Sequence, residues 1–410
     1  MASYLEKHYQ FRQRVAQLRD QRQRPQIPTA NIWLSVVGMF LVRLGSFNAL
    51  EQELRRSKRW ESWVGGRKPS ADSLGRVFSQ MLLADPRQLL AEINRSAWRR
   101  KAIHFPPAES YRVVALDGHE LWASRARCCD HCSQRELKIG EKTVVEYYHR
   151  VVVAQWVGVT PAAILDLELI APQEGEVVAA RRLLTRIVAN YSRLVDVITA
   201  DAIYLEAPFI RLVLNAGKHV VIVMKQEARE LFQDADQLRA VTEPRVLHDA
   251  RRTTRVWDIS QLSSFSTLGV AVRVVWAEES TVTRKMVGGK AQEELSVSRW
   301  VWVTELPAAI VPASKIQQWG HARWDLENRG FNELVNRWHM DHCFIHNANA
   351  IAVLLLTLAL AFLVSYLFYE RNLKPQARRH LTRSALANRF MEDFSALDGT
   401  TLWATHQQPG

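Results

Sequence analysis

Two apolar runs in this sequence each stop abruptly at an aspartate. Val113–Leu116 precedes Asp117, with a second acid, Glu120, close behind, and the run "VDVITA" precedes Asp201. Runs of β-branched and aliphatic residues are typical of strands that are buried on both faces. An ionised carboxylate is costly there unless a partner offsets its desolvation. We therefore expect each acid to lie at the end of its strand, where a ligand or a metal ion could meet it.

The segment between these runs, residues 176–192, has helical spacing and can act as a crossover connection. The two strands can then be parallel neighbours, so that Asp117 and Asp201 project from adjacent strand ends. Two carboxylates at one site repel each other unless a cation neutralises them, and aspartate oxygens suit Mg²⁺. The alternative is that each aspartate is an ordinary helix N-cap after a strand.

A third acid lies on a long predicted helix, "ASKIQQWGHARWDLENRGFNELVNRWHMDH". With residues placed at 100° intervals, Arg323 and Glu327 fall on the flank of an apolar stripe, so that Glu327 could reach the sheet while the stripe docks the helix. The stripe consists of Trp324, Phe331, Val335 and Trp338. The alternative is a surface ion pair between Arg323 and Glu327, although a basic residue N-terminal to the acid is the poorer order.

The pattern of elements changes near residue 105. Residues 1–105 have helical spacing throughout, and their basic clusters suit either a DNA-binding module or a solvated surface. From residue 111 the order of elements is β-β-β-α-β-α-β, which is the order of the ribonuclease H-like fold. We therefore expect an α/β protein in which a mixed sheet is flanked by helices, with a β-rich insertion before the last acidic helix and an all-helical N-terminal domain.

These changes in pattern predict five segments. They are a helical DNA-binding or dimerisation domain at 1–105, the first part of the ribonuclease H-like core at 106–225, the β-rich insertion at 226–311, the last core helices at 312–376 and a basic tail at 377–410.

The composition indicates a large folded protein with an anionic partner. The chain has 410 residues, of which 48% are hydrophobic, so it can bury a large core. Its formal net charge of +12 favours nucleic acid or membrane headgroups without choosing between them. Four cysteines are too few for a disulfide framework, and the N-terminal residues lack an apolar signal region, so we expect a reducing cytoplasm.

One segment, Ala350–Tyr369, is about long enough to span a bilayer. The alternative is a buried core helix, which we favour because Thr357 and Ser365 dilute its hydrophobicity and the sequence has no second span. We therefore expect no membrane partner.

The motifs "DGHE", "TADAIYLEAPF" and "RWDLENRGFNEL" together resemble the DDE transposases of bacterial insertion sequences, in the group with a Tyr-x2-Arg-x3-Glu-x6-Lys signature. The resemblance covers residues 111–376. It maps the three catalytic acids onto Asp117, Asp201 and Glu327, and the signature arginine onto Arg323. The tyrosine position falls on Gly320 and the lysine position on Leu334, or on Val335 if Gly330 is counted as an insertion; Arg337 is a possible substitute.

The resemblance implies that the three acids hold two Mg²⁺ ions and that the protein, a homodimer on DNA, cleaves transposon ends and joins them to target DNA in the bacterial cytoplasm at the nucleoid. Two alternatives stay open. One is a decayed, inactive transposase that still binds DNA, and the other is a different ribonuclease H-like nuclease that only nicks.

Two accessory patterns remain. Arg251, Arg252, Arg255 and Trp257 alternate basic and aromatic residues, which suits DNA contact with base stacking or an edge strand with a packed tryptophan. A cysteine cluster could supply half of a zinc site. Its members are Cys128, Cys129, His131 and Cys132, with Cys343, His339, His342 and His346 as possible completion.

Overall fold

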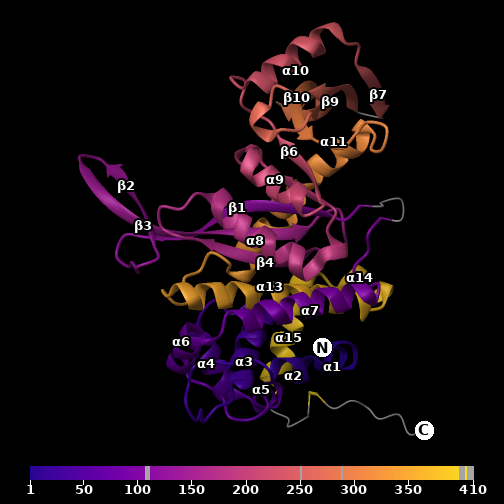
Figure 1. The fold of residues 1–410 in the computed structure, drawn as a ribbon. Coiled ribbons are helices and arrows are strands. Elements are labelled where there is room, and N and C mark those ends of the chain that lie inside the picture. The colour runs from indigo at the N-terminus through magenta and orange to yellow at the C-terminus, as the bar shows by residue number, and fades with distance from the viewer. Residues whose placement is uncertain (107–110, 250–251, 288–289, 397–401, 404–410) are drawn as a thin grey trace. The chain divides into compact units, whose positions relative to one another are not determined.

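The computed structural model describes residues 1–106, 111–249, 252–287, 290–396 and 402–403, with no description of the side chains of 283–293. Contacts divide the chain into two compact units, and Figure 1 labels most of their elements. Unit 1 contains Met1–Pro107, Gly118–Tyr191 and Glu327–Gly410, and unit 2 contains Ala108–Asp117 and Ser192–Leu326. Each unit is thus assembled from segments that are distant in the sequence.

Unit 2 is built on strands in the order β1-β5-β6-β10-β9-β8-β7. The first three are parallel and the others pair antiparallel, so the β-rich insertion continues the core strands through the pairing of β10 with β6. The strands are β1 (Val113–Ser124, in this unit up to Asp117), β5 (Val197–Ala200), β6 (His219–Val223), β7 (Arg245–Asp249), β8 (Arg252–Leu262), β9 (Val272–Val287) and β10 (Lys290–Thr304).

Helices cover the parallel strands of unit 2, which explains why β5 is buried along its whole length. α9 contacts β6, α10 contacts β8, and α11 contacts β5, β6, β9 and β10. The helices are α9 (Ala207–Asn215), α10 (Glu230–Val241) and α11 (Ala313–Ala322), with short 3₁₀ turns at Ser192–Leu194, Ala202–Tyr204 and Ser266–Leu268.

Unit 1 contains the other strands and most of the helices. β3 pairs antiparallel with β2 through its first half and with β4 through its second half, and α8 covers both β3 and β4. The elements are β2 (Ser133–Ile139), β3 (Lys142–Trp156), β4 (Ala163–Ile170) and α8 (Glu176–Tyr191), with the rest of β1 beside β3.

The long helix α13 (Ala348–Arg371) forms the core of unit 1. It is long and apolar enough to cross a membrane, but its most apolar window is completely buried against α3, α6, α7 and β4. The predicted core helix is therefore confirmed. The other helices are α1 (Ala2–Tyr9), α2 (Phe11–Val15), α3 (Thr29–Leu41), α4 (Phe47–Arg56), α5 (Lys58–Val64), α6 (Ala71–Gln80), α7 (Ala84–Arg99), α12 (Asn332–Trp338), α14 (Pro375–His380) and α15 (Arg383–Ser395).

The predicted α/β class with a ribonuclease H-like arrangement of strands and helices is confirmed. Three details are wrong. β1 does not end at Asp117 but continues to Ser124. β2 is an additional strand that was not predicted because most of its residues are polar. The predicted long helix is interrupted. After α11 the chain forms a π-helix at Leu326–Phe331 before α12 begins.

Candidate functional site

Asp117 and Asp201 directly follow the last paired residues of two adjacent parallel strands. Leu116 lies opposite Ala200 in the β1–β5 register, so the next residue on each chain segment is an aspartate. Adjacent strands are about 4.8 Å apart, which makes the two backbones close neighbours. Their side chains are 21% and 31% exposed. The register therefore brings these two predicted site residues together at a position that solvent reaches.

Each aspartate has a cation of the chain against it. The Arg323 Nη1 atom lies 2.6 Å from Oδ2 of Asp117, and Lys225 Nζ lies 2.8 Å from Oδ1 of Asp201. Arg323 is only 8% exposed, whereas Lys225 is 60% exposed. The site thus has one buried positive charge, the guanidinium of Arg323, and one exposed positive charge, the ammonium of Lys225.

Asp201 occupies the N-cap position of the 3₁₀ turn Ala202–Tyr204, but its side chain makes no capping hydrogen bond. Partial burial raises the pKa of Asp201, yet the hydrogen bond from Lys225 and the charges of Lys225 and Arg323 outweigh burial and hold the pKa below its usual value. The carboxylate is therefore ionised at neutral pH, as a ligand for a hard cation must be.

Glu327 lies in the π-helix Leu326–Phe331, four residues after Arg323, and its side chain is exposed. It belongs to unit 1, whereas the two aspartates belong to unit 2. A π-helix is rare and is frequently found at functional sites. Its wider turn also explains why the predicted stripe fails: Phe331 and Trp338 are buried, but Trp324 is 38% exposed and Val335 is only half-buried.

The departures from the signature have a structural basis. A side chain on Gly320 would place its Cβ 2.0 Å from Nε1 of Trp302, which is completely buried. The indole thus takes the space that a tyrosine would need. Leu334 is also buried, so the residue at the lysine position packs in the interior instead of facing solvent. The candidate substitute Arg337 is exposed and donates a hydrogen bond to Ser384 Oγ.

The residues predicted to contact DNA at β8 differ in their exposure to solvent. Arg251 lies outside the described residues, and Arg252 and Arg255 are exposed. Trp257 is 6% exposed and its Nε1 donates to the carbonyl of Thr242, so its ring is packed and cannot stack on a base. The packed-tryptophan alternative describes this residue.

Two further polar residues, Lys225 and Glu176, were not predicted from the sequence. Lys225 follows the apolar run of β6, so it repeats the pattern of a run that stops at a charge. Glu176 begins α8, and a Cβ on Gly118 would lie 2.1 Å from its Oε2. Glycine thus lets this carboxylate approach the residue that follows Asp117. Glu120, in contrast, is held by Arg135 through two hydrogen bonds.

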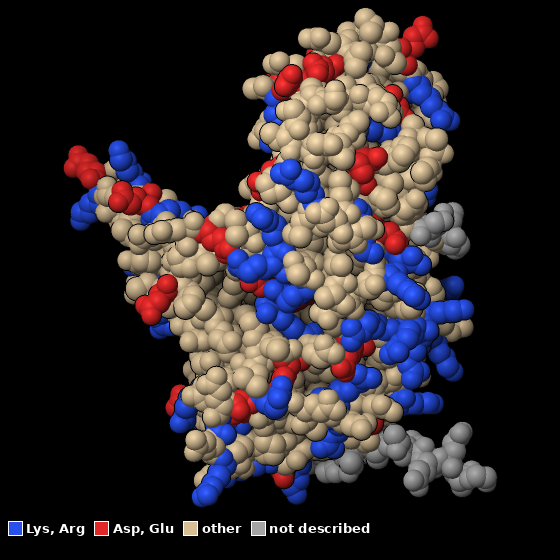
Figure 2. Space-filling model, in the orientation of Figure 1, with Lys and Arg blue, Asp and Glu red and all other residues tan. Residues whose placement is uncertain are grey.

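A basic surface lies on unit 1. Figure 2 shows Lys and Arg gathered over the part of this unit that holds α7 and α14. Arg371 donates a hydrogen bond to the carbonyl of Ala102, which links the ends of α7 and α13. The exposed cations there are Arg99, Arg100, Lys101, Arg371, Lys374 and Arg379. Such a cluster favours an anionic partner.

The comparison with protein families gives one finding that agrees with this geometry. The family described as "Transposase DDE domain" matches residues 111–364, which include both aspartates and Glu327. Among curated proteins, none matches the chain. Because the matched region is well over half of the sequence, the chain belongs to the DDE transposase family.

Proposed function

We propose that this protein is an insertion-sequence transposase that cleaves DNA at the ends of its element and joins those ends to target DNA. The observation that carries the proposal is the parallel β1–β5 register, which aligns Asp117 with Asp201 in a chain of this family. We also propose that Glu327 is the third acid and that Arg323 is the arginine of the Tyr-Arg-Glu-Lys signature.

We propose that the carboxylates of Asp117, Asp201 and Glu327 would hold two divalent cations such as Mg²⁺. Asp201 is ionised at neutral pH, and oxygen-only donors suit Mg²⁺. When bound, two such ions make a water or a DNA 3′-hydroxyl nucleophilic and stabilise the oxygens of an in-line phosphodiester displacement.

The chain's own cations have two tasks in this proposal. Lys225 and Arg323 keep Asp201 ionised by hydrogen bonding and charge, and Arg323 also forms an ion pair with Asp117. They also place positive charge beside the acids, which attracts a DNA phosphate. Arg323 is the more specific of the two because its buried guanidinium is held in one orientation.

DNA would also be held by basic residues other than Arg323 and Lys225. The basic surface at α7 and α14 suits backbone phosphates, and Arg252, Arg255 and Arg337 are exposed cations of the kind that contact phosphates. We expect the protein to act as a homodimer on transposon-end and target DNA in the cytoplasm of a bacterium, at the nucleoid.

The test is incubation of the full-length protein with duplex DNA that carries the flanking element ends, in Mg²⁺. Products are separated on a denaturing gel for wild type, Asp201→Asn and Glu327→Gln. Glu120→Gln is the matched control, because this acid is on the same strand as Asp117 but is held by Arg135. We expect cleavage and joining in wild type and control, and neither in the two variants.

Three other results would contradict the proposal, each differently. Cleavage by Asp201→Asn would show that Asp201 is not one of the catalytic acids. Nicks without joined strands from wild type would indicate a nuclease of the same fold. Binding of the ends without cleavage by wild type would indicate a decayed transposase that only binds DNA.

A further inference from the structure

Four side chains that ligate metals converge in unit 1, on residues that the candidate active site does not use. They are Cys129, Cys132, His149 and His346, and their ligand atoms all lie within 4.8 Å of one another. The distances are 3.7 Å between the two sulfurs, 3.5 and 3.4 Å from His149 Nε2 to Cys129 and Cys132, and 3.0 Å from His346 Nε2 to Cys132 Sγ.

These separations are close to the edges of a tetrahedral zinc site. With Zn–S of about 2.3 Å and Zn–N of about 2.1 Å, tetrahedral ligand atoms are about 3.8 Å (S to S) and about 3.6 Å (S to N) apart. Three of the four distances agree within about 0.2 Å, and the Cys132–His346 contact would lengthen by about half an ångström. A disulfide is not formed, because its sulfurs would be about 2.05 Å apart.

The local backbone presents both sulfurs to one point. Cys129 and Cys132 lie between β1 and β2 with two residues between them, and the N–H of Cys132 donates to the carbonyl of Cys129 at 3.0 Å. The N–H of Cys129 in turn donates to Cys132 Sγ at 3.3 Å. Such a turn with an amide donor to sulfur is the environment that stabilises a metal-bound thiolate.

The two histidines come from distant parts of unit 1. His149 lies on β3, next to the residue where pairing with β2 ends, and is 2% exposed. His346 directly precedes Asn347, the N-cap of α13, and lies 214 residues after Cys132. Trp122 packs on both imidazoles, with ring centroids 5.4 and 6.1 Å away.

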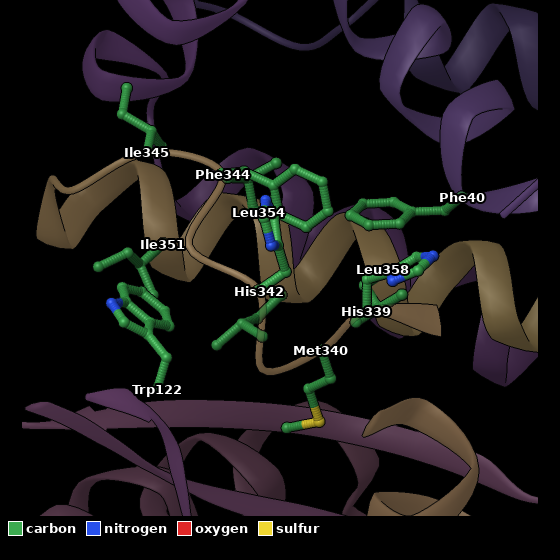
Figure 3. A pocket seen from close by; sticks show the side chains of 11 residues that line it. Phe40, Trp122, His339, Met340, His342, Phe344, Ile345, Ile351, Leu354 and Leu358 are labelled. Carbon is green, nitrogen blue, oxygen red and sulfur yellow. The ribbon is translucent and has the colours of Figure 1, made fainter. Parts of the chain in front are cut away.

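The segment that carries His346 has no helix or strand from His339 to its end at the α13 N-cap. Figure 3 shows it crossing α13 with Phe344 near Phe40, around a small apolar pocket. Apolar packing thus anchors the middle of the segment, but it does not explain why His346 Nε2 lies 3.0 Å from Cys132 Sγ.

We propose that Cys129, Cys132, His149 and His346 bind one structural Zn²⁺. Four protein ligands leave no open position, so the ion is structural and not catalytic. It joins the β1–β2 loop and β3 to the start of α13, and so fixes the connection between α12 and α13. Among the described residues, Cys128, His131, Cys343, His339 and His342 do not belong to this group, which corrects the wider set expected from the sequence.

The test is the metal content of purified full-length protein, measured by mass spectrometry of the metal after exhaustive dialysis. We expect about one zinc per chain in wild type and in the control Cys128→Ser, which changes an exposed neighbouring cysteine. Cys132→Ser and His149→Gln should retain less than about a tenth of that. This readout needs no DNA and no transposition activity, so it stands or falls separately from the proposed function.

A second measurement covers variants that fail to fold. Wild type depleted of zinc and refilled with Co²⁺ should show the visible absorption of tetrahedral cobalt with thiolate-to-metal charge transfer. Zinc-free wild type without that spectrum, or full zinc content in soluble Cys132→Ser, would overturn the proposal. Loss of zinc from Cys128→Ser as well would show that the four residues named are not the complete ligand set.

Discussion

Asp117 and Asp201 are neighbours because two adjacent strands of unit 2 are in register. Cys129, His149 and His346 are neighbours because separate segments of unit 1 pack together and bring their ligand atoms within 4.8 Å of one another. The two aspartates are partly accessible to solvent, and each forms an ion pair with a cation of the chain, exposed for Asp201 and buried for Asp117. The second group has a buried histidine and no charged partner within it. The proposed catalytic site and the proposed zinc site thus differ in what would hold them together, the sheet in the first and a bound ion in the second.

The largest effect is expected for substitution of one of the acids, which should affect cleavage but not zinc binding. Asp117→Asn should reduce cleavage of element ends on the order of 10³-fold or more, because it removes several kcal/mol of charge stabilisation from the reaction. Zinc content should not change, because Asp117 is not among the four ligands. The measurements are single-turnover cleavage rates and metal content of the same preparation. A variant that loses both would show that the two sites are not independent.

Removal of the proposed zinc should have the next largest effect, and on stability. Chelation of wild type should lower the midpoint of thermal unfolding by at least about 5 °C, since the ion binds only the folded ligand set. Cys128→Ser should respond in the same way, and Cys132→Ser should already have the lower midpoint and show no further response. If chelation lowered the unfolding midpoint of all three proteins equally, the chelator would act at a site other than these four residues.

A smaller effect is expected at Gly320. Gly320→Tyr would restore the signature tyrosine, but its Cβ would meet Trp302 at 2.0 Å, so the free energy of unfolding should fall by about 1–3 kcal/mol. Urea unfolding measures this, with Gly140→Ala as a control at a position where a Cβ meets nothing within 4 Å. Because Gly140 has φ of +61°, the control reports strain without contact. Wild-type stability in Gly320→Tyr would mean that Trp302 moves freely.

The smallest effect concerns Lys225. Its hydrogen bond helps to lower the pKa of Asp201, so the stabilisation it gives is present above the unfolded value of 3.8 and is lost as pH falls through the lower folded value. Lys225→Met should therefore cost less than about 1 kcal/mol at pH 7, because the pair is partly exposed, and nothing at the acid end. The measurement is the midpoint of denaturant unfolding at pH 7 and at a pH below the folded pKa of Asp201, with Lys218→Met as the control variant. A loss that persists at low pH would contradict the linkage.

The strands and the paired aspartates could be predicted because buried parallel strands leave a clear sequence pattern. "VVAL" and "VITA" are continuous apolar runs, and both end on the residue of interest. The continuation of β1 to Ser124 could not be predicted in this way, since the half from Asp117 onward is mostly half-buried and its apolar run is broken by Gly118, His119 and Glu120. Pairing with β3, a long-range interaction, keeps that half extended.

Three members of the Cys-His cluster could be predicted: Cys129 and Cys132 because they are three residues apart, and His346 as one of several possible completions of the site. His149 could not, since a single histidine in an apolar strand looks like a packed core residue. Only the folding of β3 against the β1–β2 loop gives it neighbours. The exposure of Trp324 was equally hidden, because a helical wheel assumes a constant angle per residue and the π-helix changes that angle.

The π-helix also changes how the spacing of the signature should be counted. Each π turn contains about one residue more than an α turn, so residues after Phe331 are displaced by one relative to a straight α-helix. Counted in turns, the lysine position moves from Leu334 to Val335. Alignments of relatives in this region should therefore tolerate a one-residue gap near Gly330, and a search pattern with fixed spacing would pass over chains built like this one.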